Sequence, residues 1–485
     1  MNIVHYLFEG KKNSNQAYIL YGGLIFTYSE IYFEILKTAF LLKDFKQRAF
    51  CIISKNSPFF ISSYFGIMAS GNISVPLNIK MSKEEFADIV DIVKPAGIFV
   101  EKELKGDFNI PPAIKVCDQD EVKNVVFENI ALKEYDNEVA SIMFTSGSSG
   151  KPKGAMISHK NLKANTKSII NYLELKESDR MEVVLPFYYC YGLSLLHTHT
   201  RVGGSVVLNN SFVMPNTVID DIKKYGCTGF AGVPSHFEIL IKTTNFLREN
   251  FLTLRYITQA GGKMRDETIL KIFNSMKAKL IVMYGQTEAT ARLSYLPYEL
   301  LPEKIGSIGR GIPGVKLRII DSDGHDVRVG KVGELIARGD NIMLGYLNGD
   351  TSSKIKKEYL YTGDLARKDA EGFIYLEGRK DDLIKIGGYR LSLSEVNAEL
   401  GRVEGVFDCY TTNRENKLFG NELISLVVLE SGFSEKKVIS EITKKLANYK
   451  IPSKFTFVKE IPLTPAGKVS KDEINKLIEN KNHGH

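Results

Sequence analysis

The chain has few cysteines, no long apolar run and no large excess of either charge. Its five cysteines are scattered over 485 residues, and no two have the spacing of a metal-binding pair. This excludes a disulfide-rich secreted domain, and a reducing compartment is the simplest expectation. No stretch approaches the roughly 18 uncharged apolar residues that a membrane-spanning helix requires, so we expect no membrane span.

The charge balance excludes a further class of partner. Lysine and arginine number 64 against 57 acidic residues, and the net charge of +7 is small for this length. A nucleic-acid-binding protein concentrates basic residues in a stripe, so we expect no nucleic acid partner. The first residues meet Glu9 before any long apolar run, unlike a signal peptide. We therefore expect a cytoplasmic protein.

What is present is an alternation of short apolar segments with helical patterns. Residues 50–54 and 73–76 have the composition of buried strands, and residues 58–69 and 83–93 have helical patterns. Strands that alternate with helices predict parallel sheets with helices on both faces. From about Gly306 glycines become frequent and the strands are hairpin-like, which predicts a β-rich subdomain.

A change in charge density near Lys380 suggests a domain boundary. We predict a large N-terminal domain over residues 1–379, made of layered α/β subdomains and the β-rich subdomain. Residues 380–485 are enough for a small α+β domain. The predicted fold class is therefore α/β with a smaller C-terminal domain.

The most informative segment is SIMFTSGSSGKPKGAMISHKNL, residues 141–162. An apolar run leads into a loop of small and hydroxyl-bearing residues, Thr145 to Gly150, which Lys153 follows. Backbone N–H groups and hydroxyls in such a loop can surround an anion, and lysine adds positive charge. A flexible turn is the alternative for this composition, but the two lysines that flank Pro152 favour a phosphate-binding loop.

A kinase-like P-loop does not fit this segment. That motif has four residues between its first glycine and the Gly-Lys pair, and a hydroxyl residue then binds magnesium. Here only two residues separate Gly147 from Gly150, and Pro152 follows Lys151.

Seven segments in order resemble the motifs of the adenylate-forming superfamily, which includes acyl-CoA synthetases, luciferases and the adenylation domains of peptide synthetases. Together they span most of the chain. They are TSGSSGKPKG at 145–154, YGQTEA at 284–289, GSIGRGIPGVKLRIID at 306–321, GELIARGDNIMLGYL at 333–347, YTGDL at 361–365, GRKDDLIKIGGYRLSLSEV at 378–396 and PLTPAGKVSKDEI at 462–474.

The resemblance implies an AMP-forming acid–thiol ligase that uses ATP and Mg²⁺. In the family, the glycine-rich loop holds the β- and γ-phosphates, Tyr284 lies against the adenine, and Asp364 accepts hydrogen bonds from the ribose hydroxyls. Arg379 is expected at the domain junction near the nucleotide. The implied ATP-binding residues are Thr145, Ser146, Gly147, Ser148, Ser149, Gly150, Lys153, Gly261, Gly262, Tyr284, Gly285, Gln286, Thr287, Asp364, Arg379 and Lys468.

The implied catalytic residues are Lys468, Thr287 and Glu288. When a carboxylate attacks the α-phosphorus, negative charge builds on the α-phosphate oxygens, and a lysine and a metal ion neutralise it. Lys468 follows a Pro-Ala-Gly turn that can present it, Thr287 would contact the α-phosphate, and Glu288 would bind Mg²⁺. A solvated surface lysine is the alternative for Lys468.

The C-terminal domain of the family is mobile. The resemblance implies that it turns about Asp381. It also implies that Gly387 and Gly388 line the path of a pantetheine arm, although Gly388 could instead support only a tight turn.

The segment LPFYYCYGL at 185–193 departs from the commonest family pattern. Tyr189 stands where many acyl-CoA synthetases carry a histidine, and no carboxylate is present to pair with an α-ammonium group. Tyr189, Gly262 and Tyr284 are the predicted substrate-binding residues. His197 and His199 lack further ligands of suitable spacing, so we expect them to pack on a helix or strand and not to bind a metal.

The expected partners are a small carboxylic acid and a thiol acceptor. The acceptor is CoA or a phosphopantetheine carrier protein, which we expect on a separate chain because no attachment site follows the catalytic loop. A stand-alone enzyme that activates a proline-like amino acid for a carrier protein is an alternative. A nucleotide-binding protein without ligase activity and an oxygen-using luciferase-like enzyme also stay open, and the sequence does not indicate the oligomeric state.

Overall fold

The computed structural model describes residues 2–127, 138–146, 152–380, 383–386, 389–416, 420–446, 450–463 and 469–480. Internal contacts divide the chain into two compact units. Unit 1 is Met1–Leu317 with Ala337–Leu360, and unit 2 is Arg318–Ile336 with Tyr361–His485. The boundary near residue 380 stays a prediction.

One sheet of unit 1 is mostly parallel. Strands β7, β4, β3, β5 and the edge strand β6 run in the same direction, and β8 and β18 add an antiparallel edge on the other side. The strand order is β18 (Gly345–Tyr346), β8 (Pro152–Ser158), β7 (Val139–Ser146), β4 (Ile73–Pro76), β3 (Ala49–Ile53), β5 (Gly97–Val100) and β6 (Lys115–Cys117).

A second sheet of unit 1 is parallel from β1 to β13 and antiparallel at both ends. The strand order is β2 (Leu24–Thr27), β1 (Ala17–Tyr21), β10 (Ser205–Leu208), β9 (Arg180–Val183), β11 (Gly229–Gly232), β12 (Tyr256–Gln259), β13 (Lys279–Tyr284), β14 (Ser294–Leu296) and β15 (Ser307–Gly311).

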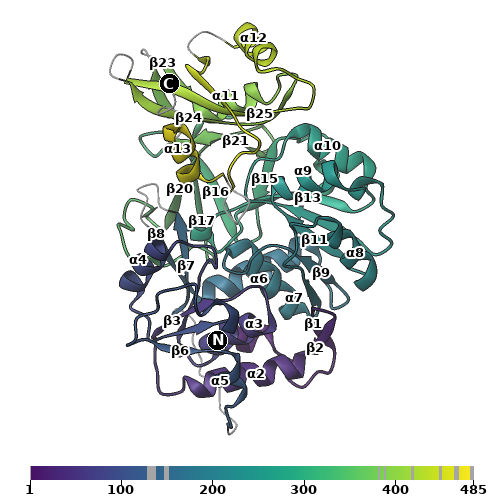
Figure 1. The fold of residues 1–485 in the computed structure, drawn as a ribbon, viewed down its shortest axis with the longest axis vertical. Helices are drawn as coiled ribbons and strands as arrows, with labels where there is room; N and C mark the ends of the chain where they lie inside the picture. The colour runs from purple at the N-terminus through teal and green to yellow at the C-terminus, as the bar shows by residue number, and fades with distance from the viewer. Residues whose placement is uncertain are drawn as a thin grey trace. The chain divides into compact units, whose positions relative to one another are not determined.

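Helices connect and cover these strands, and Figure 1 shows α8, α9 and α10 beside β9, β11 and β13. The α-helices of unit 1 are α1 (Ile3–Leu7), α2 (Tyr28–Leu41), α3 (Pro58–Ala69), α4 (Lys83–Val93), α5 (Gln119–Lys123), α6 (His159–Leu173), α7 (Cys190–Val202), α8 (Asn216–Tyr225), α9 (Pro234–Thr243) and α10 (Asp266–Ser275). The short 3₁₀ helices are η1 (Lys102–Leu104), η2 (Phe246–Arg248), η3 (Thr287–Ala289) and η4 (Tyr298–Leu300).

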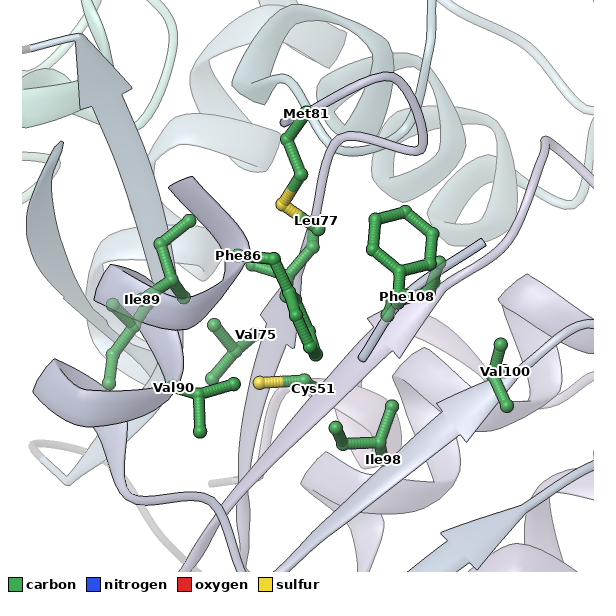
Figure 2. Close-up of a cluster of buried hydrophobic side chains, with 12 residues drawn as sticks. Cys51, Val75, Leu77, Met81, Phe86, Ile89, Val90, Ile98, Val100 and Phe108 are labelled. Atoms are coloured by element: carbon green, nitrogen blue, oxygen red, sulfur yellow. The ribbon is translucent and has the colours of Figure 1, made fainter. Parts of the chain in front are cut away.

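A compact apolar cluster explains why the first predicted elements form. Phe86, Ile89 and Val90 project from one face of α4 onto the strands that carry Cys51 and Val75, and all five are buried (Figure 2). Their i, i+3, i+4 spacing is that of an amphipathic helix packed on a sheet. Burial of each large apolar side chain contributes about 1.5–3 kcal/mol to folding.

Side-chain caps fix where two of these helices begin. Ser57 accepts a hydrogen bond from the N–H of Phe60 at 3.1 Å, and Pro58 occupies the first turn of α3. Ser82 accepts from the N–H of Glu85 at 3.1 Å at the start of α4. Such caps satisfy N–H groups that have no partner within the helix. The predicted helices 58–69 and 83–93 therefore have the bounds expected.

The β-rich region predicted from about Gly306 runs through strands that neighbour one another in the order β16 (Val315–Ile320), β17 (Gly333–Gly339), β20 (Tyr359–Lys368) and β21 (Ile374–Arg379), with β19 (Ile355–Lys356) beside β20. The rest of unit 2 contains the hairpin β22 (Leu383–Ile386) and β23 (Tyr389–Ser392), the sheet β24 (Val406–Asn416), β25 (Gly420–Leu429) and β26 (Lys454–Phe457), and helices α11 (Leu393–Leu400), α12 (Glu435–Lys445) and α13 (Lys471–Asn480). The predicted α+β content of the C-terminal region is confirmed.

Unit 2 has apolar cores of its own. Val396, Val427 and Ile442 from α11, β25 and α12 are fully buried in one cluster. Leu426 and Ile474 from β25 and α13 belong to another. No helix in the described part of the chain is both long and apolar enough to span a membrane.

Candidate active site

The predicted phosphate-binding loop joins two paired strands. β7 and β8 are antiparallel, with Thr145 opposite Lys153 and Ser146 opposite Pro152. The pairing brings both ends of the loop together, with Thr145 and Lys153 at its base. The loop residues Gly147, Ser148, Ser149 and Gly150 lie outside the described residues.

Asn348 anchors the strand that follows this loop. Its Oδ1 accepts a hydrogen bond from the N–H of Gly154 at 3.1 Å, and its Nδ2 donates to the carbonyl of Pro152 at 3.0 Å. Each hydrogen bond to a buried backbone group typically contributes about 0.5–1.5 kcal/mol. Asn348 directly follows the GYL of a family motif and had no predicted role.

Lys153 and Glu288 both lie beside Tyr346. The Lys153 Nζ is 5.7 Å from the centre of the Tyr346 ring, and the Tyr346 hydroxyl donates to Glu288 Oε1 at 2.6 Å. One tyrosine thus contacts both the predicted phosphate-binding cation and the predicted metal ligand. Tyr346 had no predicted role, although it lies within the motif GELIARGDNIMLGYL.

The surroundings of Glu288 fit a magnesium ion. Its side chain is only 8% exposed. One carboxylate oxygen accepts from Tyr346, and the other accepts no hydrogen bond from any residue that the structure describes. A buried carboxylate requires compensation for its charge. Mg²⁺ prefers carboxylate oxygens together with water and substrate phosphates, so this site fits the ion when it arrives with a polyphosphate.

A sharp turn after β13 places these residues. A Cβ atom on Gly285 would lie 1.8 Å from the carbonyl oxygen of Ala291, so only glycine allows this approach. The chain then forms η3, and Glu288 sits directly beyond the carboxyl end of β13. The amide nitrogen Nε2 of Gln286 is buried and has no hydrogen-bond partner among the described residues.

The residues predicted for the adenine and the acid follow neighbouring parallel strands. β12 and β13 pair with Gln259 opposite Val282, Tyr284 ends β13, and Gly261 and Gly262 come shortly after β12. Gln259 Nε2 donates to the carbonyl of Gly262 at 2.6 Å. Because ligands of α/β sheets bind beyond the carboxyl ends of strands, this edge is a suitable place for them.

The first turn of α7 lies against the motif YGQTEA, residues 284–289. Tyr189 precedes the helix, and its ring is 4.7 Å from that of Tyr188. The Cys190 Sγ is 3.6 Å from the Thr287 hydroxyl. Burial raises the pKa of Tyr188, so its hydroxyl stays neutral. The structure thus brings the predicted substrate segment next to the residue predicted for the α-phosphate.

Asp364 and Arg379 lie side by side within unit 2. They are opposite each other on β20 and β21, and the Arg379 Nε is 3.4 Å from Asp364 Oδ1. The Asp364 N–H donates to the Thr362 hydroxyl at 3.1 Å, and that hydroxyl donates to the Leu335 carbonyl at 2.7 Å. The carboxylate is therefore held on a well-bonded strand, and the nucleotide roles of both residues stay predictions.

Lys468, Asp381, Gly387 and Gly388 lie outside the described residues. Their predicted roles as catalytic lysine, hinge and thiol path therefore stay predictions.

His197 and His199 pack inside unit 1 on α7, as expected. His197 Nε2 is 3.1 Å from the Tyr64 hydroxyl, and His199 Nδ1 is 2.8 Å from the Leu195 carbonyl. Burial lowers the pKa of His197 to about 3 and also lowers that of His199. Both histidines are neutral members of the core.

Family comparison agrees with this geometry. The model of the AMP-binding enzyme family matches residues 9–347, and the model of the AMP-binding enzyme C-terminal domain matches residues 395–468. The chain belongs to the AMP-binding enzyme family. The prediction that the chain is an enzyme of the adenylate-forming class is thereby confirmed.

Curated relatives are similar along most of their length. An indoleacetate–CoA ligase from Aromatoleum aromaticum is 28% identical over 448 residues, which cover 88% of this chain and 87% of that protein. A 2-succinylbenzoate–CoA ligase from Bacillus velezensis is 27% identical over 430 residues, with the same coverage of 88% and 87%.

Solved structures confirm the adenylate-forming fold. ATP-bound MatB from Rhodopseudomonas palustris has a TM-score of 0.89 at 22% identity, covering 99% of both chains. O-succinylbenzoate CoA synthetase from Bacillus subtilis, in complex with ATP and magnesium, has a TM-score of 0.85 at 25% identity. It covers 98% of this chain and 99% of that chain.

Proposed function

We propose that the enzyme joins a carboxylic acid to a thiol in two steps. First, a carboxylate oxygen attacks the α-phosphorus of ATP, and the bond between that phosphorus and the oxygen that bridges to the β-phosphate breaks. This forms an acyl-adenylate and releases pyrophosphate. Then a thiol loses its proton, the sulfur attacks the carbonyl carbon, and AMP leaves. The contact of Tyr346 with both Lys153 and Glu288 carries this proposal, because it gathers a cation and a metal-binding carboxylate beside the phosphate-binding loop.

Residues of the chain have distinct tasks in the first step. Lys153 neutralises the terminal phosphates, the Thr287 hydroxyl donates to the α-phosphate, and Lys468 bridges that phosphate and the attacking carboxylate. Mg²⁺, when bound at Glu288, stabilises negative charge on the phosphate oxygens. Asp364 holds the ribose hydroxyls in this proposal.

The proposed acceptor is the thiol of CoA or of a phosphopantetheine carrier protein. The names of the curated relatives favour CoA. Both acceptors end in the same pantetheine thiol, so Gly387 and Gly388 would serve either one. Thioester formation with free CoA and with a loaded carrier protein distinguishes them.

Activation of an amino acid is the weaker alternative. An α-ammonium group requires a carboxylate partner, and the segment that contains Tyr188, Tyr189 and Cys190 offers none. A buried cation lies beside this segment, because the Arg292 guanidinium is 4.1 Å from the centre of the Tyr191 ring. Like charges repel, so this surrounding disfavours an ammonium substrate.

The test is acid-dependent exchange of pyrophosphate into ATP across a panel of carboxylic acids. We expect exchange with at least one acid, and a loss of about 10²–10³-fold in Glu288→Gln, as for other groups that stabilise transition-state charge. Glu303→Gln, which alters an exposed carboxylate, is the matched control. ATP binding without exchange for any acid would support a nucleotide-binding protein instead.

A further inference from the structure

Arg292 is a buried cation that has no anionic partner among the residues that the structure describes. Only 2% of the residue's surface is exposed to solvent. The Nε donates to Met283 Sδ at 3.2 Å, and Nη1 donates to the Ala291 carbonyl at 3.3 Å. Both acceptors are neutral, and Arg292 forms no ion pair with any described residue. Because a guanidinium does not lose its proton in proteins, the charge persists.

Arg255 shows how the same unit treats an arginine that is purely structural. Its guanidinium also lies over a tyrosine ring, 4.7 Å from the centre of Tyr256. Yet it is 35% exposed and pairs with Asp179 at 2.6 Å. Although burial acts to raise it, hydrogen bonding from Arg255 holds the pKa of Asp179 below its usual value. Arg292 is more deeply buried, and no carboxylate in the described part of the chain pairs with it.

The backbone before Arg292 is strained and firmly held. Thr290 and Ala291 have φ angles of 53° and 98°, a left-handed region that non-glycine residues rarely adopt. Asn341 secures this turn, because its Nδ2 donates to the carbonyls of Ala289 at 3.1 Å and Arg292 at 2.7 Å. Strain of this kind costs about 1–3 kcal/mol per residue and collects at functional sites.

The turn directs the guanidinium to the segments predicted to bind the acid. The Arg292 guanidinium lies 4.1 Å from the centre of the Tyr191 ring. Tyr191 comes two residues after Tyr189 in the sequence. Tyr191 in turn shares a hydrogen bond of 2.8 Å with Thr258, near the end of β12 and shortly before Gly262. Met283, which accepts from Arg292, directly precedes Tyr284. Each of the three predicted substrate residues is therefore within four sequence positions of Tyr191, Thr258 or Met283, the residues connected to Arg292.

The neutral groups nearby are suited to receive an anion with Arg292. Burial raises the pKa of Tyr191 to about 12, although the guanidinium opposes this, so the hydroxyl stays protonated. The Tyr172 hydroxyl, whose pKa burial also raises, interacts with the same guanidinium. Arginine binds carboxylates through two parallel hydrogen bonds, which are among the strong ones in proteins.

We propose that Arg292 binds a second anionic group on the acid substrate, so that the substrate class is a dicarboxylate or a carboxylate that carries a sulfonate or phosphate. The inference rests on the proposed function, because it assigns the far end of the acid whose near carboxylate is activated. The anion compensates the buried charge of Arg292, for which the described residues provide no counter-ion.

The experiment compares each diacid with its own monoamide, which has nearly the same shape and one charge fewer. Acid-dependent pyrophosphate exchange is measured for malonate, succinate, glutarate, adipate and benzene dicarboxylates, each beside its monoamide. The readout is the ratio of kcat/KM between diacid and monoamide. We expect a ratio above about 10 for one pair, and a fall of about 10–100-fold in Arg292→Leu, mostly through KM, from loss of a charged hydrogen bond.

Two further variants keep the test independent of folding. Arg292→Lys retains the charge and should restore part of the ratio, whereas Arg292→Gln should not. Arg255→Gln removes the paired arginine and should leave the ratio unchanged even if it lowers the melting temperature.

The outcomes separate the two proposals. Exchange with monocarboxylates alone, or a ratio that Arg292→Leu and Arg292→Gln leave unchanged, would overturn the role of Arg292 and leave the acid-activating function intact. Absence of exchange for every acid, charged or neutral at the far end, would overturn the proposed function and this inference with it.

Discussion

At the scale of residues, the site holds its buried charges with neutral partners. Glu288 accepts from a tyrosine hydroxyl, and Arg292 contacts a thioether, a carbonyl and an aromatic ring. Neutral partners orient a charge without cancelling it, so the remaining attraction is available to a ligand. This arrangement is costly in the free protein and suits a site that binds a metal–nucleotide complex and an anionic acid.

Lys468→Ala should nearly abolish adenylation while ATP still binds. The lysine is proposed to neutralise charge that develops on the α-phosphate only as the acid attacks, an effect worth about 2.7–4 kcal/mol for comparable donors. Acid-dependent pyrophosphate exchange measures the loss, and Lys459→Ala, at an exposed position, is the control. If the Lys468 variant keeps most of its exchange activity, the lysine has no catalytic task.

Tyr346→Phe should raise the Mg²⁺ concentration that the enzyme needs for activity. The Tyr346 hydroxyl donates a hydrogen bond of 2.6 Å to Glu288 Oε1, the proposed metal ligand. Loss of a group that is hydrogen-bonded to a metal ligand commonly lowers metal affinity 10–100-fold. We therefore expect about a tenfold rise in the Mg²⁺ concentration that gives half-maximal exchange. Tyr375→Phe, which keeps the ring that Arg367 covers, is the matched control. Unchanged Mg²⁺ dependence in Tyr346→Phe would remove Glu288 from the metal site.

At the scale of elements, local chemistry determined what the sequence could predict. The bounds of α3 and α4 followed from Ser57, Pro58 and Ser82, because caps and periodic apolar residues act within a few positions. Tyr346 and Arg292 were missed because their partners are distant in sequence. Tyr346 contacts Glu288 across 58 positions, and Arg292 meets Tyr191 across the fold. Family motifs supplied those regions but not the contacts within them.

The buried histidines of α7 should make unit 1 sensitive to acid. His197 stays neutral in the folded protein because burial lowers its pKa to about 3 from 6.5, whereas in the unfolded chain it binds a proton below about pH 6.5. The stabilisation is therefore complete above pH 6.5 and is lost as the pH falls toward 3. Between pH 7.5 and 5.5, one such group lowers the free energy of unfolding by about 1.4 kcal/mol.

His197→Gln should flatten this dependence. Thermal melting from pH 7.5 to 5.5 should show a smaller fall in Tm for His197→Gln than for the unaltered protein. His325→Gln is the control, because His325 is exposed in unit 2. An identical fall in Tm for all three proteins would show that His197 does not titrate on unfolding.

At the scale of the whole molecule, the proposed reaction makes opposing demands on the C-terminal domain. In the proposed mechanism, adenylation uses Lys468 beside the α-phosphate, and thioester formation uses the segment with Gly387 and Gly388 beside the path of the pantetheine arm. We propose that one position of the domain does not serve both steps and that a hinge at Asp381 lets them occur in turn. Separate assays of the two half-reactions test this proposal.

Gly388→Leu should separate those half-reactions. A branched side chain should block the narrow path proposed for the pantetheine arm, whereas most of the residues proposed to bind ATP, Mg²⁺ and the acid lie earlier in the sequence, between Thr145 and Arg379. Pyrophosphate exchange should persist, and thioester output should fall about 100-fold, equivalent to about 3 kcal/mol of barrier. Gly401→Leu is the control, because a Cβ atom there meets only ordinary contacts, the nearest at 3.4 Å. Melting curves identify any variant that unfolds, and an equal loss of both half-reactions in a folded Gly388→Leu protein would rule out the two-position mechanism.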